Sequence, residues 1–233
     1  MTQSHGDPAT PVQVKASDLE RLEQLEATLY TAVVSDALDD LGLRDQAMAE
    51  RLRPIGPLTT FAGRARTISC IDTYHLDDDP YGMEIAAIDS IVAGEVVVVC
   101  TGESKRNAPW GELLSTAAIA RGARGAVVDG LVRDVRRIQE LGFPLYAAGV
   151  KPVDSKGRGR VLAYNVPVHC GGVLVHPGDL VIGDLDGIIV IPSAVIEVVL
   201  RAATDKVSRE NSSREELRKG AYLRAVYDKY GVL

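Results

Sequence analysis

Arg133 and Asp134 stand side by side directly after the apolar segment GAVVDGLV, and both residue types can perform chemistry. A short apolar run bounded by turn signals is typical of a buried strand, so the pair follows a core strand. Arginine presents a planar fork that suits a carboxylate or an enolate oxygen, and aspartate is an oxygen ligand for Mg²⁺ or Mn²⁺. Because ligands bind at the carboxyl ends of strands in open α/β sheets, the pair is a candidate site. The plainer alternatives are a surface ion pair, or Asp134 as the N-cap of the next helix.

A second candidate lies 21 positions before the arginine (133 − 112), where Glu112 begins an expected helix over residues 112–123. Gly111 marks the start of this helix, and the N–H groups near Leu113 and Leu114 have no partner within it. Together with the helix dipole, these donors form a binding site for a small carboxylate. The plainer alternative is an ordinary helix start with Glu112 as a favourable first-turn acid.

A strand, a helix and a second strand are expected around these residues. The run EVVVVC predicts a buried strand at 95–100, and GAVVDG predicts another at 125–130, with the helix 112–123 between them. Such a unit has parallel strands and a right-handed crossover. We interpret Asp129, which is followed by Gly130, as turn chemistry at the end of the second strand.

Helices are expected at both ends of the chain. Residues 15–43 have apolar side chains at helical spacing, and Ser17 with Glu20 forms a capping-box pattern. Residues 193–230 are also helical and carry many charges, which is typical of an exposed helix or arm.

Loops and hairpins occupy the remaining segments. The acidic segment 75–82 is interpreted as a solvated loop, and the glycine-rich, basic segment 153–161 as a flexible loop. Asp184 is expected to shape a hairpin turn. Turn pairs between apolar runs predict two hairpins, at Pro177-Gly178 and at Asp186-Gly187.

Composition limits the classes of function. A chain of 233 residues suits one large domain with a helical arm. The net charge of −6 argues against a general nucleic-acid surface, and 5% aromatic residues are too few for a base-stacking platform. No apolar run reaches the roughly 18 residues that a membrane span needs. We expect a disordered segment at 1–14, a catalytic domain at 15–200 and a helical arm at 201–233.

The three cysteines indicate a reducing compartment. Cys70, Cys100 and Cys170 are odd in number, widely spaced and next to apolar runs. This pattern predicts reduced core residues in a cytoplasmic protein rather than a disulfide framework or a zinc site. The four histidines have no zinc-binding spacing.

Several segments together resemble the RraA-like family. They are WGELLSTAA, GAVVDGLVRDV, FPLYAAGVKP and VPVHCGGVLVHPGDLVIGDLDGIIVIP, with TAVVSDAL and FAGRARTI before them. This family contains 4-hydroxy-4-methyl-2-oxoglutarate / 4-carboxy-4-hydroxy-2-oxoadipate aldolases and the regulator of ribonuclease E activity. The resemblance runs in order from about Leu29 to about Glu210. It implies an α/β fold of the swivelling β/β/α type with helical N- and C-terminal segments, and a homotrimer or homohexamer with active sites between subunits.

The resemblance also implies metal-dependent class II pyruvate aldolase chemistry with oxaloacetate decarboxylation. The aldolase members carry an aspartate, twenty residues and then Arg-Asp, and here Arg133 and Asp134 match. Glu112 stands where those members have the aspartate, which keeps the charge and adds one methylene group. On this basis Asp134 is expected to hold Mg²⁺ or Mn²⁺, and Arg133 to stabilise the pyruvate enolate. Glu112 is expected to orient a water molecule that carries protons.

Substrate binding is expected at the helix start. Gly111, Leu113 and Leu114 would contact the substrate carboxylate together with Arg133. Glu210 from the arm of a neighbouring subunit is expected to complete the site. The alternatives are a non-catalytic RraA-like binding protein that regulates a ribonuclease, and an enzyme that is chiefly an oxaloacetate decarboxylase.

Overall fold

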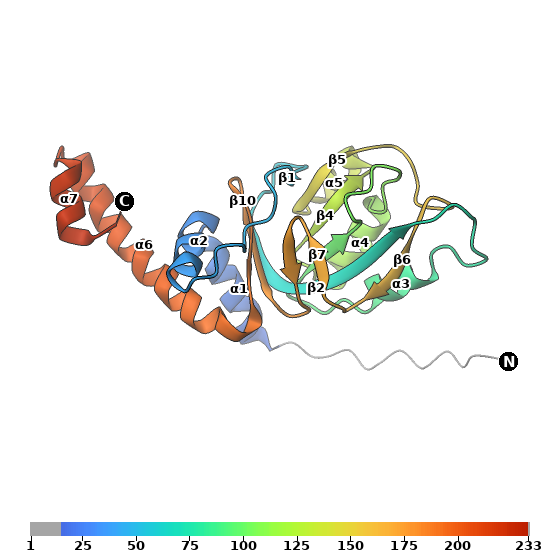
Figure 1. Cartoon of the computed structure of the whole chain (residues 1–233), viewed down its shortest axis with the longest axis horizontal. Coiled ribbons are helices and arrows are strands. Elements are labelled where there is room, and N and C mark those ends of the chain that lie inside the picture. Colours follow the sequence, from blue (N-terminus) through green and yellow to red (C-terminus); the bar gives the residue numbers. More distant parts are fainter. Residues whose placement is uncertain (1–14, 233) are drawn as a thin grey trace.

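A mixed eight-stranded sheet forms the centre of the computed structural model, which describes residues 15–232 (Figure 1). The strand order is β1-β5-β4-β3-β2-β9-β10, and β6 also pairs with β2. The sheet curls into a nearly closed barrel, so its two edges lie near each other. Its strands are β1 (Arg53–Pro54), β2 (Phe61–Asp72), β3 (Glu95–Cys100), β4 (Gly125–Val132), β5 (Leu145–Val150), β6 (Gly159–Tyr164), β9 (Leu180–Asp184) and β10 (Gly187–Ile191).

Four neighbouring strands, β2 to β5, form a parallel centre. Both faces of this part are covered, which explains why β3 reads as the uninterrupted apolar run EVVVVC with four buried valines. The expected parallel strand–helix–strand unit is confirmed, because α4 connects the paired strands β3 and β4. Three helices pack apolar residues against one face: α3 (Gly82–Asp89), α4 (Glu112–Ala120) and α5 (Val135–Leu141).

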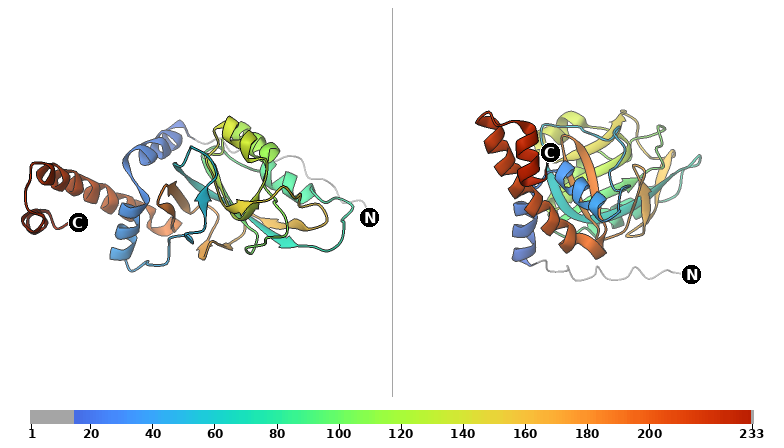
Figure 2. Two further views of the ribbon diagram at one scale, coloured as in Figure 1. Left: turned by 90° about the horizontal axis from the view of Figure 1, so that it is seen from above. Right: turned by 60° about the vertical axis from the view of Figure 1, so that its left-hand side comes forward.

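Of the remaining helices, α1, α2 and the first part of α6 pack at the other end of the sheet, against β9 and β10. The last long helix extends beyond the body of the protein and folds back through a short terminal helix (Figure 2). The expectation of helices at both ends is confirmed. They are α1 (Ala16–Thr28), α2 (Thr31–Asp40), the short η1 (Ser193–Val195), α6 (Ile196–Arg218) and α7 (Leu223–Tyr230).

Two expectations about local signals are wrong. Residue 17 lies inside α1 rather than at its cap, and the cap residue Lys15 makes no side-chain hydrogen bond, so the capping box does not form. Pro177-Gly178 does not close a hairpin, because it connects strands of different sheets. The separate hairpin of β7 (Val168–Cys170) and β8 (Val173–Val175) turns at Gly171-Gly172, and both glycines have the positive φ that such a turn requires.

Asp129 and the segment 153–161 also differ from expectation. Asp129 lies inside β4, which continues to Val132, and a register shift in the pairing with β5 follows Val128. Its side chain is 1% exposed and accepts hydrogen bonds from the Thr101 N–H and hydroxyl, so it is a core acceptor rather than a turn residue. The second half of 153–161 is not a loop, because β6 begins there and pairs with β2.

Asp184 and Asp186 lie at the turn between β9 and β10, as expected. The Asp184 carboxylate accepts hydrogen bonds from the Asp186 N–H and from Thr31 at the start of α2. The three cysteines are free thiols, and burial raises the pKa of each. Within residues 15–232, no helix has both the length and the apolar character needed to cross a membrane.

Candidate active site

The candidate site forms where the end of β4 meets the start of α4. The Arg133 N–H donates to the Trp110 carbonyl at 2.9 Å, which ties these two chain segments together. Trp110 is buried at 1% exposure, stacks on Phe143, and donates its indole N–H to Ser115 inside α4. A rigid apolar anchor thus sets the position of the helix start relative to the strand end.

The carboxylate of Asp134 lies against the first turn of α4. The Glu112 N–H donates to its Oδ2 atom at 3.3 Å. A Cβ atom on Gly111 would lie 2.6 Å from the same oxygen, so only glycine permits this approach. The N–H groups of Leu113 and Leu114 have no acceptor among the described residues. The structure therefore brings the helix start and Asp134 together, with two helix donors left for a ligand.

Asp134 adopts the left-handed backbone conformation, with φ 59° and ψ 28°. Aspartate is among the few residues that tolerate this region, which is strained for most side chains. Asp134 occupies the N-cap position of α5, as the alternative expected, but its side chain makes no capping hydrogen bond to that helix. The conformation turns the carboxylate toward α4 instead, and strained backbone of this kind is concentrated at functional sites.

The Arg133 guanidinium lies between two aspartates. Its Nε is 3.7 Å from Asp134 Oδ2, and its Nη2 is 3.2 Å from Asp154 Oδ1. The Tyr81 hydroxyl donates to the other Asp154 oxygen at 2.5 Å. Sequence reasoning missed Asp154 and Tyr81 because it placed them in solvated or flexible loops. Asp154 follows β5, the strand next to β4, so the rule about carboxyl ends of strands could have found it.

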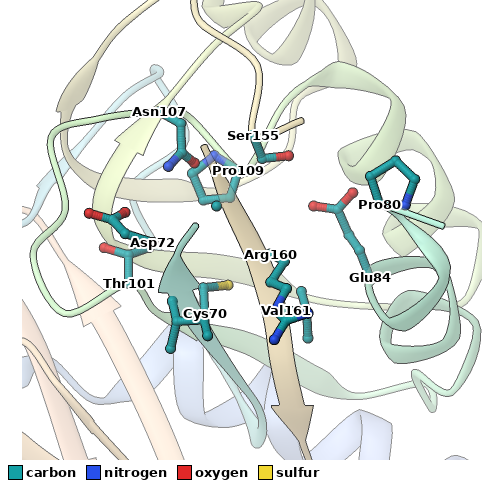
Figure 3. Close-up of a pocket in the computed structure, with 12 residues that line it drawn as sticks. Cys70, Asp72, Pro80, Glu84, Thr101, Asn107, Pro109, Ser155, Arg160 and Val161 are labelled. Carbon is teal, nitrogen blue, oxygen red and sulfur yellow. The ribbon is translucent and has the colours of Figure 1, made fainter. Parts of the chain in front are cut away.

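Glu84 is a further acid that the sequence did not single out. It extends from α3 into a small polar pocket behind the site, toward Ser155 (Figure 3). Burial raises the pKa of Glu84 to about 7; the negative charge of Asp154 adds to this effect and the positive charge of Arg133 opposes it. The Glu84 carboxyl therefore titrates close to neutral pH.

Substitution of Glu84 by glutamine should weaken the pH dependence of stability. The unfolded state releases the Glu84 proton near pH 4.5, whereas the folded state keeps it until about pH 7. Wild-type stability is therefore lost as pH rises through this interval, by roughly 1–3 kcal/mol from this residue. Urea denaturation of both proteins at pH 5 and pH 8 measures the difference. Equal changes in the free energy of unfolding would contradict the assignment.

Glu210 lies on α6, away from this cluster. It accepts a hydrogen bond from the Tyr30 hydroxyl, and Arg214 lies 3.8 Å from it. In Figure 1, α6 lies on the opposite side of the molecule from α4 and α5. Within a single chain Glu210 is therefore apart from Arg133 and Asp134, and its role in the site of a neighbouring subunit stays a prediction.

The structure is an α/β fold in which Arg133, Asp134 and the first turn of α4 meet at a strand end, and comparison with known proteins identifies its family. The family described as RraA-like: Aldolase/RraA matches residues 31–190. A Halalkalibacterium halodurans protein named "Putative 4-hydroxy-4-methyl-2-oxoglutarate aldolase" is 33% identical over 188 residues, which cover 81% of this chain and 84% of that protein. An Azotobacter vinelandii protein of the same name is 35% identical, covering 59% of this chain and 80% of that one.

Solved structures agree with this result. The crystal structure of Streptomyces coelicolor RraAS2, described as an unusual member of the RNase ES inhibitor RraA protein family, superposes with a TM-score of 0.75 at 30% identity. The superposition covers 84% of this chain and 96% of that one. This chain belongs to the RraA-like family, and the expected fold is confirmed.

Proposed function

We propose that the protein is a divalent-metal-dependent aldolase. Its substrates are 4-hydroxy-2-oxo dicarboxylic acids of the 4-hydroxy-4-methyl-2-oxoglutarate type, cleaved to pyruvate and a second 2-oxo acid. The observation that carries the proposal is the meeting of three groups: the Asp134 carboxylate, the Arg133 guanidinium and the first turn of α4. The aldolase names of the relatives support the same chemistry.

The residues present fit a weakly held divalent ion. The Asp134 side chain is 45% exposed, so its carboxylate is accessible to a ligand from solvent. Residues 15–232 contain no group of three or more histidine, cysteine or acidic side chains that could hold a metal. One carboxylate, completed by waters and substrate oxygens, is typical of Mg²⁺ and also suits Mn²⁺. When bound, such an ion polarises a carbonyl oxygen and stabilises negative charge on it.

The protein groups supply binding and charge stabilisation. The free N–H groups of Leu113 and Leu114 bind the substrate C1 carboxylate at the positive end of α4. Cleavage of the C3–C4 bond leaves the electron pair on the pyruvate enolate, and Arg133 stabilises its oxygen. Loss of carbon dioxide from oxaloacetate leaves the same enolate, so one site supports both reactions.

Glu112 is proposed to orient the water that carries protons to and from the substrate. Its Oε1 accepts a hydrogen bond at 2.8 Å from the hydroxyl of Thr116, one turn further along α4. This bond directs the glutamate side chain, which is longer than an aspartate side chain, along the helix. Replacement by glutamine should lower kcat by roughly 10²-fold, because the carboxylate is lost at unchanged size. Glu112→Asp should retain more activity than Glu112→Gln. Equal kcat values for Glu112→Gln and wild type would contradict this role.

A coupled assay tests the proposed function. Protein stripped with EDTA is mixed with lactate dehydrogenase and NADH, with and without Mg²⁺ or Mn²⁺, and supplied with 4-hydroxy-4-methyl-2-oxoglutarate or oxaloacetate. Metal-dependent pyruvate release above the rate with metal alone is the expected result. The ratio of kcat/KM for the two substrates shows whether the enzyme is chiefly an aldolase or chiefly a decarboxylase. No release on either substrate would overturn the assignment.

A second candidate is a non-catalytic regulator of a ribonuclease. The observation that favours it is the structural similarity to RraAS2, which is described as a member of the RNase ES inhibitor RraA protein family. A regulator needs no turnover, so inhibition of ribonuclease E by protein that releases no pyruvate would favour this candidate.

We also propose a homotrimer or homohexamer in the cytoplasm. The end of the chain leaves four large apolar side chains exposed outside the body of the subunit, which suits contact with another copy. The free thiols agree with a reducing compartment. The four side chains are Leu217, Tyr222, Leu223 and Tyr227.

A further inference from the structure

Asp154 and Tyr81 form a chain of contacts that ends on the Arg133 guanidinium. Asp154 uses one oxygen for Arg133 Nη2 at 3.2 Å and the other for the Tyr81 hydroxyl at 2.5 Å. Tyr81 precedes α3 and Asp154 follows β5, so two separate loops meet the end of β4 at this point. One Asp154 oxygen thus faces the Arg133 cation in an ion pair, and the other accepts a hydrogen bond from Tyr81.

The contacts on Arg133 lie along the edge of its planar guanidinium group that carries Nε and Nη2. Nε faces Asp134 at 3.7 Å, and Nη2 faces Asp154 at 3.2 Å. Neither of these ion pairs involves Nη1. A guanidinium held along one edge presents its remaining N–H groups in a fixed direction, which suits recognition of an oxyanion.

The charge state of Asp154 suits an ion pair with the Arg133 guanidinium. Burial alone would raise the pKa of Asp154, but the hydrogen bond from Tyr81 and the charge of Arg133 outweigh it and lower the pKa. The same hydrogen bond, together with burial, raises the pKa of Tyr81 to about 12, so the tyrosine keeps its proton. At neutral pH the pair is therefore a carboxylate with a hydroxyl donor.

We propose that Asp154 is a positioning residue for Arg133, and that Tyr81 orients Asp154. The inference rests on the proposed function for its effect on catalysis, because Arg133 is the group that stabilises the enolate. A free arginine side chain has considerable rotamer freedom, and Asp154 restricts that freedom before substrate binds. Asp154 itself does not contact the reacting atoms.

Kinetics with a double-mutant cycle test the proposal. Asp154→Asn should lower kcat/KM for pyruvate release by about 10-fold or more, and Tyr81→Phe by a smaller factor. Asp154→Glu should recover part of the loss. Affinity for oxalate, a stable analogue of the enolate, is measured by calorimetry on the Mg²⁺-supplied protein. Asp154→Asn should weaken oxalate affinity in the wild-type background. In the Arg133→Ala background it should leave oxalate affinity nearly unchanged, because both substitutions act through the Arg133 guanidinium.

The matched control removes another aspartate that forms an ion pair with an arginine. Asp89 on α3 lies 2.8 Å from Arg121 at the far end of α4, so Asp89→Asn should leave kcat/KM unchanged. Additive effects of Asp154→Asn and Arg133→Ala on oxalate affinity would overturn the proposal.

Crystal structures of Asp154→Asn and wild type provide a test that does not depend on activity. The Arg133 guanidinium should leave its position or lose defined density in the variant. An unchanged guanidinium would overturn the proposal even if activity fell. A displaced guanidinium in a protein that releases no pyruvate would support the positioning role and reject the proposed function instead.

Discussion

Asp134→Ala should lower metal-dependent pyruvate release by about 10³-fold or more, the largest catalytic effect expected from any single substitution. A divalent ion contributes several kcal/mol of charge stabilisation to an enolate-forming step, and each 1.4 kcal/mol corresponds to about tenfold in rate. Asp134 is the exposed carboxylate beside both Arg133 and the α4 start. The coupled lactate dehydrogenase assay, run over a range of Mg²⁺ concentrations, measures the loss.

Two further variants make this result specific. Asp134→Asn keeps the size and the oxygen that accepts from the Glu112 N–H, but it removes the charge, so it should also lose most activity. Glu140→Gln removes an acid on α5 that forms ion pairs with exposed Arg136 and Arg137, and it should behave like wild type. Full activity of Asp134→Asn at wild-type Mg²⁺ concentrations would contradict a metal-binding role for Asp134.

Asp129→Ala should have the largest effect on stability, a loss of about 2–4 kcal/mol. The side chain is 1% exposed and accepts two hydrogen bonds from Thr101, at 2.5 Å from the N–H and 2.8 Å from the hydroxyl. Alanine leaves both donors buried without this acceptor and opens a cavity in the core. Urea denaturation monitored by the fluorescence of the buried Trp110 measures the free energy of unfolding.

The conservative variant separates hydrogen bonding from packing. Asp129→Asn keeps the volume and one acceptor oxygen, so it should lose clearly less stability than Asp129→Ala. The loop that begins at Thr101 continues to the α4 start, so Asp129→Ala should also reduce pyruvate release at temperatures where the protein remains folded. If Asp129→Ala matched wild type in stability, the hydrogen bonds to Thr101 would not contribute to folding.

Local patterns in the sequence were sufficient to predict several parts of the protein. The valine run of β3 predicted a strand buried on both faces, and the small-residue helix before GAVVDG predicted a parallel crossover, which the pairing of β3 with β4 confirms. Glu112, Arg133 and Asp134 were singled out because they lie at a helix start and after a strand. Those positions meet at one edge of a parallel sheet, so the structure brings them together.

Contacts between distant loops had no such signal. Tyr81 and Asp154 are 73 residues apart, in segments without periodic pattern, so only the folded chain shows that they meet. Asp129 followed by glycine looked like a turn, yet the pairing of β4 with β5 resumes past it at Leu131, and the Asp129 side chain is buried. A dipeptide signal of this kind has less influence than the hydrogen bonds of a central strand.

The sequence by itself determined which residue types stand at the helix start and at the strand end, because turn residues and apolar runs depend on near neighbours in the chain. The tertiary structure decided where their side chains point. The left-handed backbone at Asp134 directs its carboxylate to α4 rather than to α5. Asp154 forms an ion pair with one edge of the Arg133 guanidinium. These directions depend on backbone conformation and on partners from other loops, which no local pattern specifies.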